Sequence, residues 1–333
     1  MMSVLGRSGL LLVALWSLSA CSGLDLGEAR KLGQGGMTAS TTLRDEARQA
    51  KSDVDSWREL GRPLNIALIE GGEPERSPGV DKSSERLAKA LAARTRAMEK
   101  LLATYTAFDA LARYDAVGET EKAVGSFIDE TNGFVQAVQQ LGTSNAAAGI
   151  PLVDPQVAEG IRIVFGVIAE EVQKRKVAKA SHLIRESVDR LAKAVAAEKL
   201  FAVEARRKNL SDRQMLRAKL FAGGIASRSE DLKRVFDDLR IKPVADLDAA
   251  ISRAPTKVRA GMQGYLAYLD KRDLAHVPEA YDELVGLLEG LVKQHAKLEE
   301  GAKVDLEDIK AWVERLAKYY KRVKDAKGAS EGG

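Results

Sequence analysis

Apolar residues recur at spacings of three and four along most of this chain. One segment keeps the pattern without interruption, with a single polar member, and consists of Val124, Phe127, Thr131, Phe134, Val138 and Leu141. Residues at these spacings share one face of an α-helix, whereas a strand needs alternation with a period of two. No segment sustains that alternation. The spacing therefore predicts an all-α fold.

Several of the predicted helices are long. The stripes that contain Leu43, Leu87 and Ile184 each extend over several turns, and the pattern that opens near Pro155 continues to about Asn209. At about 1.5 Å per residue, roughly 50 helical residues make a rod of about 75 Å. Stripes with this spacing pack at shallow angles. We therefore expect an elongated helical bundle with long, coiled-coil-like helices.

The order of these patterns suggests a division of the chain. We expect a flexible, glycine-rich tether over residues 21–40 and a long-helix bundle over 41–222. Residues 223–327 should form shorter helices, interrupted at prolines, and a C-terminal helical hairpin that turns near Gly301 and packs on the bundle. Asp305 should cap the last helix. Gly223-Gly224 is a candidate boundary between two lobes, and residues 328–333 should form a disordered tail.

Composition supports a packed body and excludes some classes of partner. Hydrophobic residues make up 45% of the chain, which is enough for a core, so the body is not a disordered chain. Aromatic residues make up only 5%, and few of them interleave with basic residues, which argues against nucleic acid as a partner. Basic residues number 52 and acidic residues 48 in the whole chain, and the first 20 residues contain one of the basic residues. The near balance of the remaining chain predicts neither nucleic acid nor a strongly acidic partner.

The first 20 residues have the pattern of a secretory signal. A basic start with Arg7 precedes an apolar run from Gly9 to Trp16, and the small residues Ser19 and Ala20 follow. The run is too short for a membrane span, which needs about 20 apolar residues. Cys21, the only cysteine of the chain, comes next, so no disulfide can form within the protein.

Leu18-Ser19-Ala20-Cys21 resembles the lipobox of bacterial lipoproteins. The resemblance implies cleavage between Ala20 and Cys21, a diacylglycerol on the Cys21 thiol, and acylation of the new amine. Ser22 stands where an aspartate favours retention at the inner membrane, so the resemblance implies outer-membrane sorting with the body in the periplasm or at the cell surface. The alternative is an ordinary secretory signal that ends near a free cysteine. The resemblance covers only these first residues, and we recognise no family for the body.

No catalytic or metal-binding pattern stands out, so we expect neither catalytic residues nor a cofactor. Each of the three histidines, His182, His276 and His295, has a glutamate three or four residues later, but the Glu-x-x-His pairs of di-iron bundles are absent. His295 lies in an apolar stripe. We expect a buried histidine with its second nitrogen hydrogen-bonded; the alternative is a pH-sensitive joint between the last two helices.

One cluster of basic residues is a candidate contact surface. It contains Arg206, Arg207, Lys208, Arg213 and Arg217, with few acids nearby. Its simplest interpretation is solvated surface; the alternative is contact with anionic headgroups or an acidic partner.

Three functions follow from these patterns. The first is a non-catalytic, lipid-anchored envelope protein that presents a helical surface for protein binding, spacing or assembly. The second is a membrane-active protein acting through the apolar segment 150–172, although a buried core segment explains that segment more simply. The third is an enzyme or small-ligand binder with a pocket between helices.

Overall fold

The computed structural model describes residues 23–67, 78–114, 116–142, 148–161, 169–222 and 256–328, and it confirms the all-α fold. The described residues contain no strand. The elements are the α-helices α2 (Leu26–Ala67), α3 (Pro78–Arg113), α4 (Val117–Gln139), α6 (Ala169–Ala222), α9 (Thr256–Glu299) and α10 (Glu307–Gly328), and the 3₁₀-helix η2 (Pro155–Ile161).

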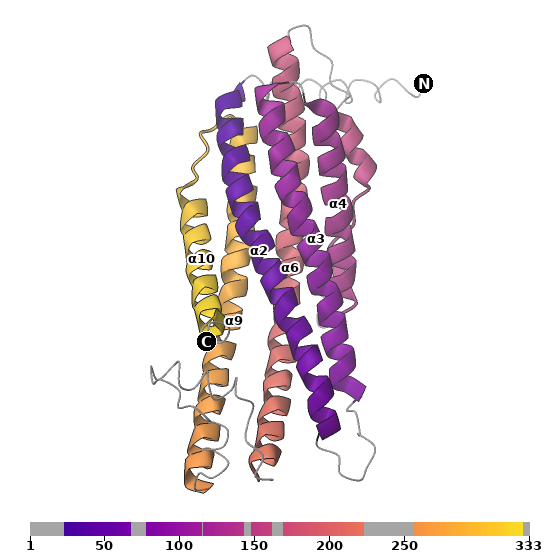
Figure 1. Ribbon diagram of the computed structural model, residues 1–333. Coiled ribbons are helices and arrows are strands. Elements are labelled where there is room, and N and C mark those ends of the chain that lie inside the picture. The colour runs from indigo at the N-terminus through magenta and orange to yellow at the C-terminus, as the bar shows by residue number, and fades with distance from the viewer. Residues whose placement is uncertain are drawn as a thin grey trace, which may run out of the picture.

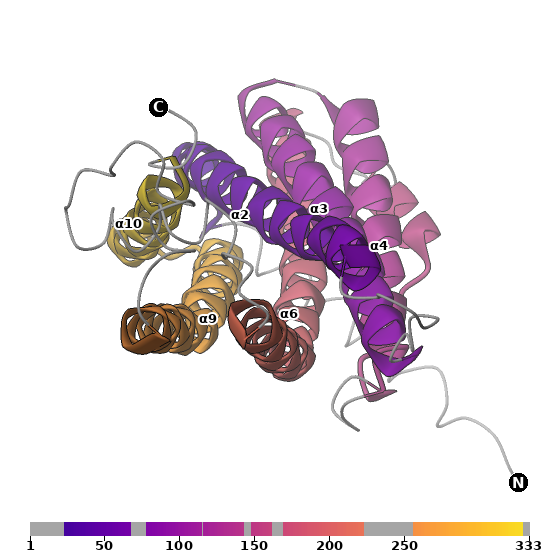
Figure 2. The ribbon, with the colours of Figure 1, turned by 60° about the horizontal axis from the view of Figure 1, so that its bottom comes forward.

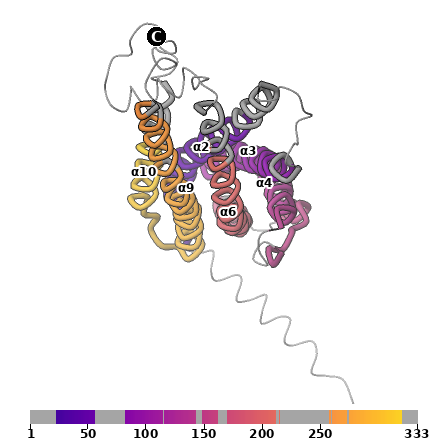
Figure 3. Tube along the Cα trace, turned by 90° about the horizontal axis from the view of Figure 1, so that it is seen from below, coloured from indigo at the N-terminus to yellow at the C-terminus, as the bar shows by residue number. Residues whose placement is uncertain are grey.

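The long helices lie side by side in an elongated bundle (Figure 1). Helix α6 has 54 residues, which corresponds to a length of about 80 Å. Helix α2 crosses the bundle diagonally, from a start beside α10 and α9 toward its main neighbour α3 (Figures 1 and 2). Helix α4 and η2 cover one flank, and α10 lies on the opposite flank against α9 (Figure 3). Every described α-helix therefore has a partner along its apolar stripe.

The core follows the predicted stripes. Tyr105, Phe108, Phe127 and Phe134 are fully buried among leucine, valine and alanine side chains from all the long helices. Helices of this length are marginal alone, so the packing of these stripes stabilises them. No described helix contains a segment long and apolar enough to cross a membrane.

The expected tether over residues 21–40 is wrong from Leu26 onward, because these residues form the first turns of α2. Leu32 and Ala39 are fully buried. The glycines mark close helix contacts: a Cβ on Gly36 would lie 2.1 Å from Cδ1 of Tyr105, and one on Gly35 would lie 2.7 Å from Cδ1 of Leu306. Because glycine has no side chain, α2 can approach α3 and α10 closely at these positions. Glycine here serves close packing rather than flexibility.

The expectation of short helices after residue 223 is also wrong where the structure describes the chain. Helix α9 is continuous over 44 residues and passes through Pro278. Proline in a helix removes one hydrogen bond, but buried residues on both sides of it, including Leu269 and Leu284, hold the two halves on one axis. The predicted helix from Pro155 is divided: η2 comes first, and α6 begins at Ala169. The proposed lobe boundary at Gly223-Gly224 and the tail beyond Gly328 lie outside the described residues.

The predicted hairpin between α9 and α10 is confirmed. Gly301 has a φ of +74°, a conformation that favours glycine. The N–H of Ala302 donates to the carbonyl of Lys297 at 2.8 Å, and that of Gly301 donates to the carbonyl of Leu298 at 3.1 Å, which together form a Schellman C-cap. Asp305 caps α10 by accepting the N–H of Glu307 at 3.0 Å.

Candidate functional site

Ala20 and Cys21 lie outside the described residues, but the chain is fixed to the bundle almost directly after them. Gly23 lies against the turn between α9 and α10, where a Cβ on Gly301 would be 3.0 Å from the carbonyl oxygen of Gly23. Leu24 is buried. Glu28, on the first turn of α2, accepts the N–H of Val304 at 2.7 Å. These contacts place the start of the described chain firmly at one end of the bundle.

The structure does not gather the described members of the basic cluster on one face. Arg206 is half-buried and lines a crevice between helices. Arg207 is exposed and pairs with Glu204, with Nη1 2.8 Å from Oε2, and Lys208 is exposed as well. The side chains of Arg213 and Arg217 lie outside the described part of α6. Because neighbouring residues on a helix point about 100° apart, the described members face different surroundings.

A buried arginine on α3 is the centre of a polar cluster that connects four helices. Arg94 on α3 is fully buried; its Nη2 donates to Oε1 of Glu46 on α2 at 2.9 Å, and its Nη1 donates to Oε1 of Glu198 on α6 at 3.1 Å. The hydroxyl of Tyr281 on α9 donates to the same oxygen of Glu198 at 2.5 Å. The ring of Tyr281 also lies 5.3 Å from Cζ of Arg94, within cation–π range. We call these four residues the arginine cluster.

The arginine cluster carries two carboxylates and one guanidinium. Burial raises the pKa of Glu198, and the charge of Arg94 offsets only part of this effect. Burial, and next the charge of Glu198, raise the pKa of Tyr281 well above its usual value, so the phenol stays a neutral donor. Loss of one partner from such a buried group costs about 3–5 kcal/mol, because the remaining charge is left without compensation. The cluster therefore fixes how the four helices lie relative to one another.

A second buried network surrounds His295 and confirms the prediction of a buried, hydrogen-bonded histidine. Its Nε2 lies 3.0 Å from the hydroxyl of Tyr105, and its Nδ1 lies 2.8 Å from the hydroxyl of Ser181. Burial, with a smaller contribution from the charge of Arg185, lowers the pKa of His295 to about 3. Phe108 packs against the imidazole with its ring centroid 5.7 Å away. The histidine is thus neutral and links α3, α6 and α9.

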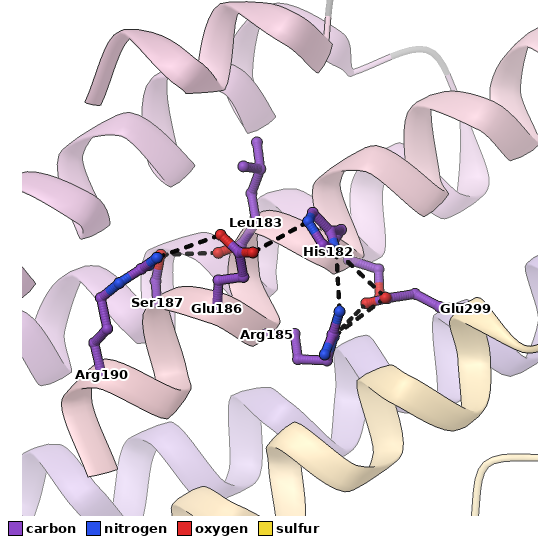
Figure 4. A network of polar contacts seen from close by, with 8 residues as sticks. His182, Leu183, Arg185, Glu186, Ser187, Arg190 and Glu299 are labelled. Carbon is purple, nitrogen blue, oxygen red and sulfur yellow. Dashed lines mark hydrogen bonds and ion pairs between the residues drawn. The ribbon is translucent and has the colours of Figure 1, made fainter. Parts of the chain in front are cut away.

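A surface network of polar side chains joins α6 and α9 through His182, Arg185 and Glu299 (Figure 4). Ser181 also donates to Oε1 of Glu299 at 3.3 Å, and Nε of Arg185 donates to both oxygens of Glu299 at 3.1 Å. His182 lies between two carboxylates: its Nε2 is 3.3 Å from Glu186, and its Nδ1 is 3.5 Å from Glu299. Glu299 therefore pairs with His182 on the neighbouring helix rather than with His295 of its own helix.

A crevice opens beside the arginine cluster, between α2, α3, α6, α9 and α10. Its volume is about 70 Å³. Most of the lining is apolar, with Leu87, Leu91 and Val277 among the contributors. Its polar lining consists of Glu46, Gln49, Asp53, Arg206, Tyr281 and Tyr319.

The described residues assemble no metal site, and a serine–histidine pair among them is buried. No three histidine, cysteine, aspartate or glutamate side chains of the described chain gather as metal ligands. Ser181 and His295 have the residue types of a nucleophile and a base, but both are fully buried and neither lines the crevice. A substrate could not reach their polar atoms in this conformation.

The arginine cluster has a sequence signal that periodicity alone does not flag. Glu46 lies three residues after Leu43 and four before Ala50, and Arg94 stands in the same relation to Leu91 and Met98. A charged residue at a stripe position is expected to point inward with the stripe. The pairing of Glu46 with Arg94, however, joins two different helices, so it can be identified only from the folded structure.

No protein-family model matches the chain, and comparison with curated proteins and with solved structures gives no match either.

Proposed function

We propose that this protein is a lipid-anchored, non-catalytic protein of the cell envelope that presents a helical surface for protein binding, spacing or assembly. The observation that carries the proposal is Leu18-Ser19-Ala20-Cys21 directly behind the apolar run Gly9–Trp16. Acyl chains contribute about 0.8 kcal/mol per buried methylene, so two or three chains on Cys21 anchor a protein durably. Ser22 favours the outer membrane, with the body in the periplasm or at the cell surface.

The position of Gly23 supports a defined orientation of the bundle. Only Ser22 separates Cys21 from Gly23, so their Cα atoms lie at most about 7.6 Å apart. The end of the bundle that holds Gly23 and Gly301 would then rest beside the headgroups. Helix α9 runs from this end for 44 residues, which carries its first residue, Thr256, about 65 Å away. The bundle itself, rather than a flexible tether, would provide the spacing.

Exposed apolar side chains favour a partner-binding surface far from the anchor. Leu200 on α6 is 59% exposed, and Tyr268 on α9 is 57% exposed. Tyr268 lies 31 residues before the end of α9, about 46 Å from the Gly23 end of the bundle. Leu200 lies nearer to that end, at about 26 Å, because the neighbouring Lys199 pairs with Asp282 of α9. Val258, further along α9, is also exposed. A protein partner would cover these side chains, since aromatic and aliphatic anchors dominate protein interfaces.

The alternative of a membrane-active segment over residues 150–172 has less support. Ile150, Ala158 and Ile161 are buried in the bundle, although Leu152 and Val157 are exposed. Residues 162–168 lie outside the described chain. The described contacts favour a structural role for this segment.

Fractionation of cells that express Cys21→Ala tests the anchor, with Ser22→Ala as a matched control that keeps the thiol. We expect Ser22→Ala in the membrane fraction and Cys21→Ala released from it. Retention of Cys21→Ala on the membrane would contradict the proposal. A photoreactive residue at position 268 should then capture a protein that the same residue at Lys193, on a solvated face of α6, does not. Equal capture at both positions would argue against a distal binding surface.

A further inference from the structure

The turn that follows α3 lies at the same end of the bundle as Gly23. Nε of Arg30, on the second turn of α2, donates to the carbonyl of Ala112 at 3.1 Å, and a Cβ on Gly33 would lie 3.0 Å from Cα of Asp109. The last turn of α3 therefore packs beside the first turns of α2. The start of α2, the end of α3 and the turn between α9 and α10 all lie toward the upper end of the bundle in Figure 1.

Tyr114 places an exposed aromatic residue at this end. It follows the last residue of α3 and is 58% exposed. Its N–H donates to the carbonyl of Ala110, and its carbonyl accepts the N–H of Ala116, both at 2.9 Å, so its backbone is held while the residue stays accessible. Tyrosine combines an apolar ring with a polar tip, and for that reason it is enriched at membrane–water interfaces.

Charged side chains of this end are compatible with lipid phosphates. Asp109 pairs with Arg113 just before Tyr114, with Oδ2 2.7 Å from Nε, and Glu28 pairs with Lys31, with Oε1 3.0 Å from Nζ. These pairs reduce the repulsion between the two carboxylates and a phosphate group. Lys303 is exposed on the turn between α9 and α10. Its ammonium can donate charge-assisted hydrogen bonds to phosphate oxygens at a membrane surface.

We propose that the bilayer that holds the acyl chains of Cys21 covers this end of the bundle, with the ring of Tyr114 in its headgroup layer and the ammonium of Lys303 at its phosphates. The inference rests on the proposed anchor and adds a second membrane contact to it. The headgroup layer of one leaflet is about 5–8 Å thick, which is comparable to the distance of at most about 7.6 Å between the Cα atoms of Cys21 and Gly23. Contacts at the ends of two neighbouring helices would keep the bundle from tilting about Cys21.

Tryptophan quenching on vesicles tests this inference. The mature chain, residues 21–333, is coupled through the Cys21 thiol to a maleimide phospholipid in phosphatidylcholine vesicles whose acyl chains are brominated close to the headgroup. This coupling replaces lipidation by the cell, so the membrane contact can fail while the natural anchor holds, and the reverse. We expect the fluorescence that Tyr114→Trp adds to that of Trp57 and Trp312 to fall by about half or more relative to unbrominated vesicles. Absence of quenching at position 114 would overturn the proposal.

Three further variants define the extent of the contact. Lys303→Trp should be quenched like Tyr114→Trp. Leu200→Trp is the matched control, because Leu200 is as exposed as Tyr114 but lies about 26 Å from the Gly23 end, and it should not be quenched. Tyr268→Trp, about 46 Å from that end, should not be quenched either. Circular dichroism confirms that each variant is folded. Equal quenching at positions 114 and 200 would show that the bundle lies flat on the membrane, and it would overturn the proposal.

Discussion

Acidification should destabilise this bundle through His295. The imidazole is fully buried, and both of its nitrogens contact hydroxyl groups, those of Tyr105 and Ser181. Burial is the main cause that lowers its pKa from 6.5 to about 3, and the charge of Arg185 adds to it. The folded protein therefore keeps this group neutral at pH values where the unfolded chain protonates it.

The sign and the size follow from proton linkage. Between about pH 3 and pH 6.5 the unfolded chain binds more protons at this residue than the folded protein, so stability falls as the pH falls. Each pKa unit corresponds to about 1.4 kcal/mol. From pH 7.5 to pH 5 this single group should therefore lower the free energy of unfolding by about 2 kcal/mol. The neighbouring Tyr105 does not titrate in this range, because burial raises its pKa.

Urea unfolding followed by circular dichroism measures this loss in the parent chain and in His295→Gln. Glutamine keeps a donor and an acceptor but does not titrate, so the variant retains only the pH dependence of the other groups. We expect the parent to lose about 2 kcal/mol more than His295→Gln between the two pH values. Equal losses in the two proteins would refute the assignment of a buried, neutral histidine.

Two further predictions test the packing, each by urea unfolding against a control. Arg94→Met should lower the free energy of unfolding by about 3–5 kcal/mol, because it leaves buried carboxylates without their cation. The control Arg96→Met breaks an exposed pair with Glu130 and should change stability by less than about 1 kcal/mol. Similar losses in the two variants would contradict the role of the arginine cluster. Gly36→Ala should destabilise by about 1–3 kcal/mol, since its Cβ would lie 2.1 Å from Tyr105. Gly133→Ala, with no neighbouring atom within 4 Å, should stabilise by about 1 kcal/mol; a stable Gly36→Ala would show that α2 does not pack this closely.

The helical class was predictable because each stripe is a local pattern. Val124 to Leu141 shows three-four spacing within one element, and no distant contact is needed to interpret it. The same holds for the turn at Gly301 and the cap at Asp305, whose signals lie within a few residues of the structure that they specify.

The first turns of α2 were not predictable in this way. Gly33 to Gly36 has the composition of a flexible linker, and only the approach of Tyr105 and Leu306 shows that these glycines admit neighbouring helices. The continuity of α9 through Pro278 has a similar cause, since packing against α6 overrides a local helix breaker. Local propensity is a weak prior wherever tertiary contacts are extensive.

The polar interior could be predicted only in part. Glu46 and Arg94 stand at stripe positions, so their burial follows from the sequence. Their partnership, and that of Ser181 with His295, joins residues more than 40 positions apart on different helices. Such pairs depend on the order and the relative height of the helices, which single-helix periodicity does not specify.

Mass spectrometry of the N-terminal peptide from membrane-extracted protein tests the central proposal most directly. The account predicts a mature chain that starts at Cys21 and carries a diacylglycerol thioether on its sulfur, with a further acyl group on its amine. An unmodified Cys21 thiol, or a peptide that still contains Leu18-Ser19-Ala20, would contradict it.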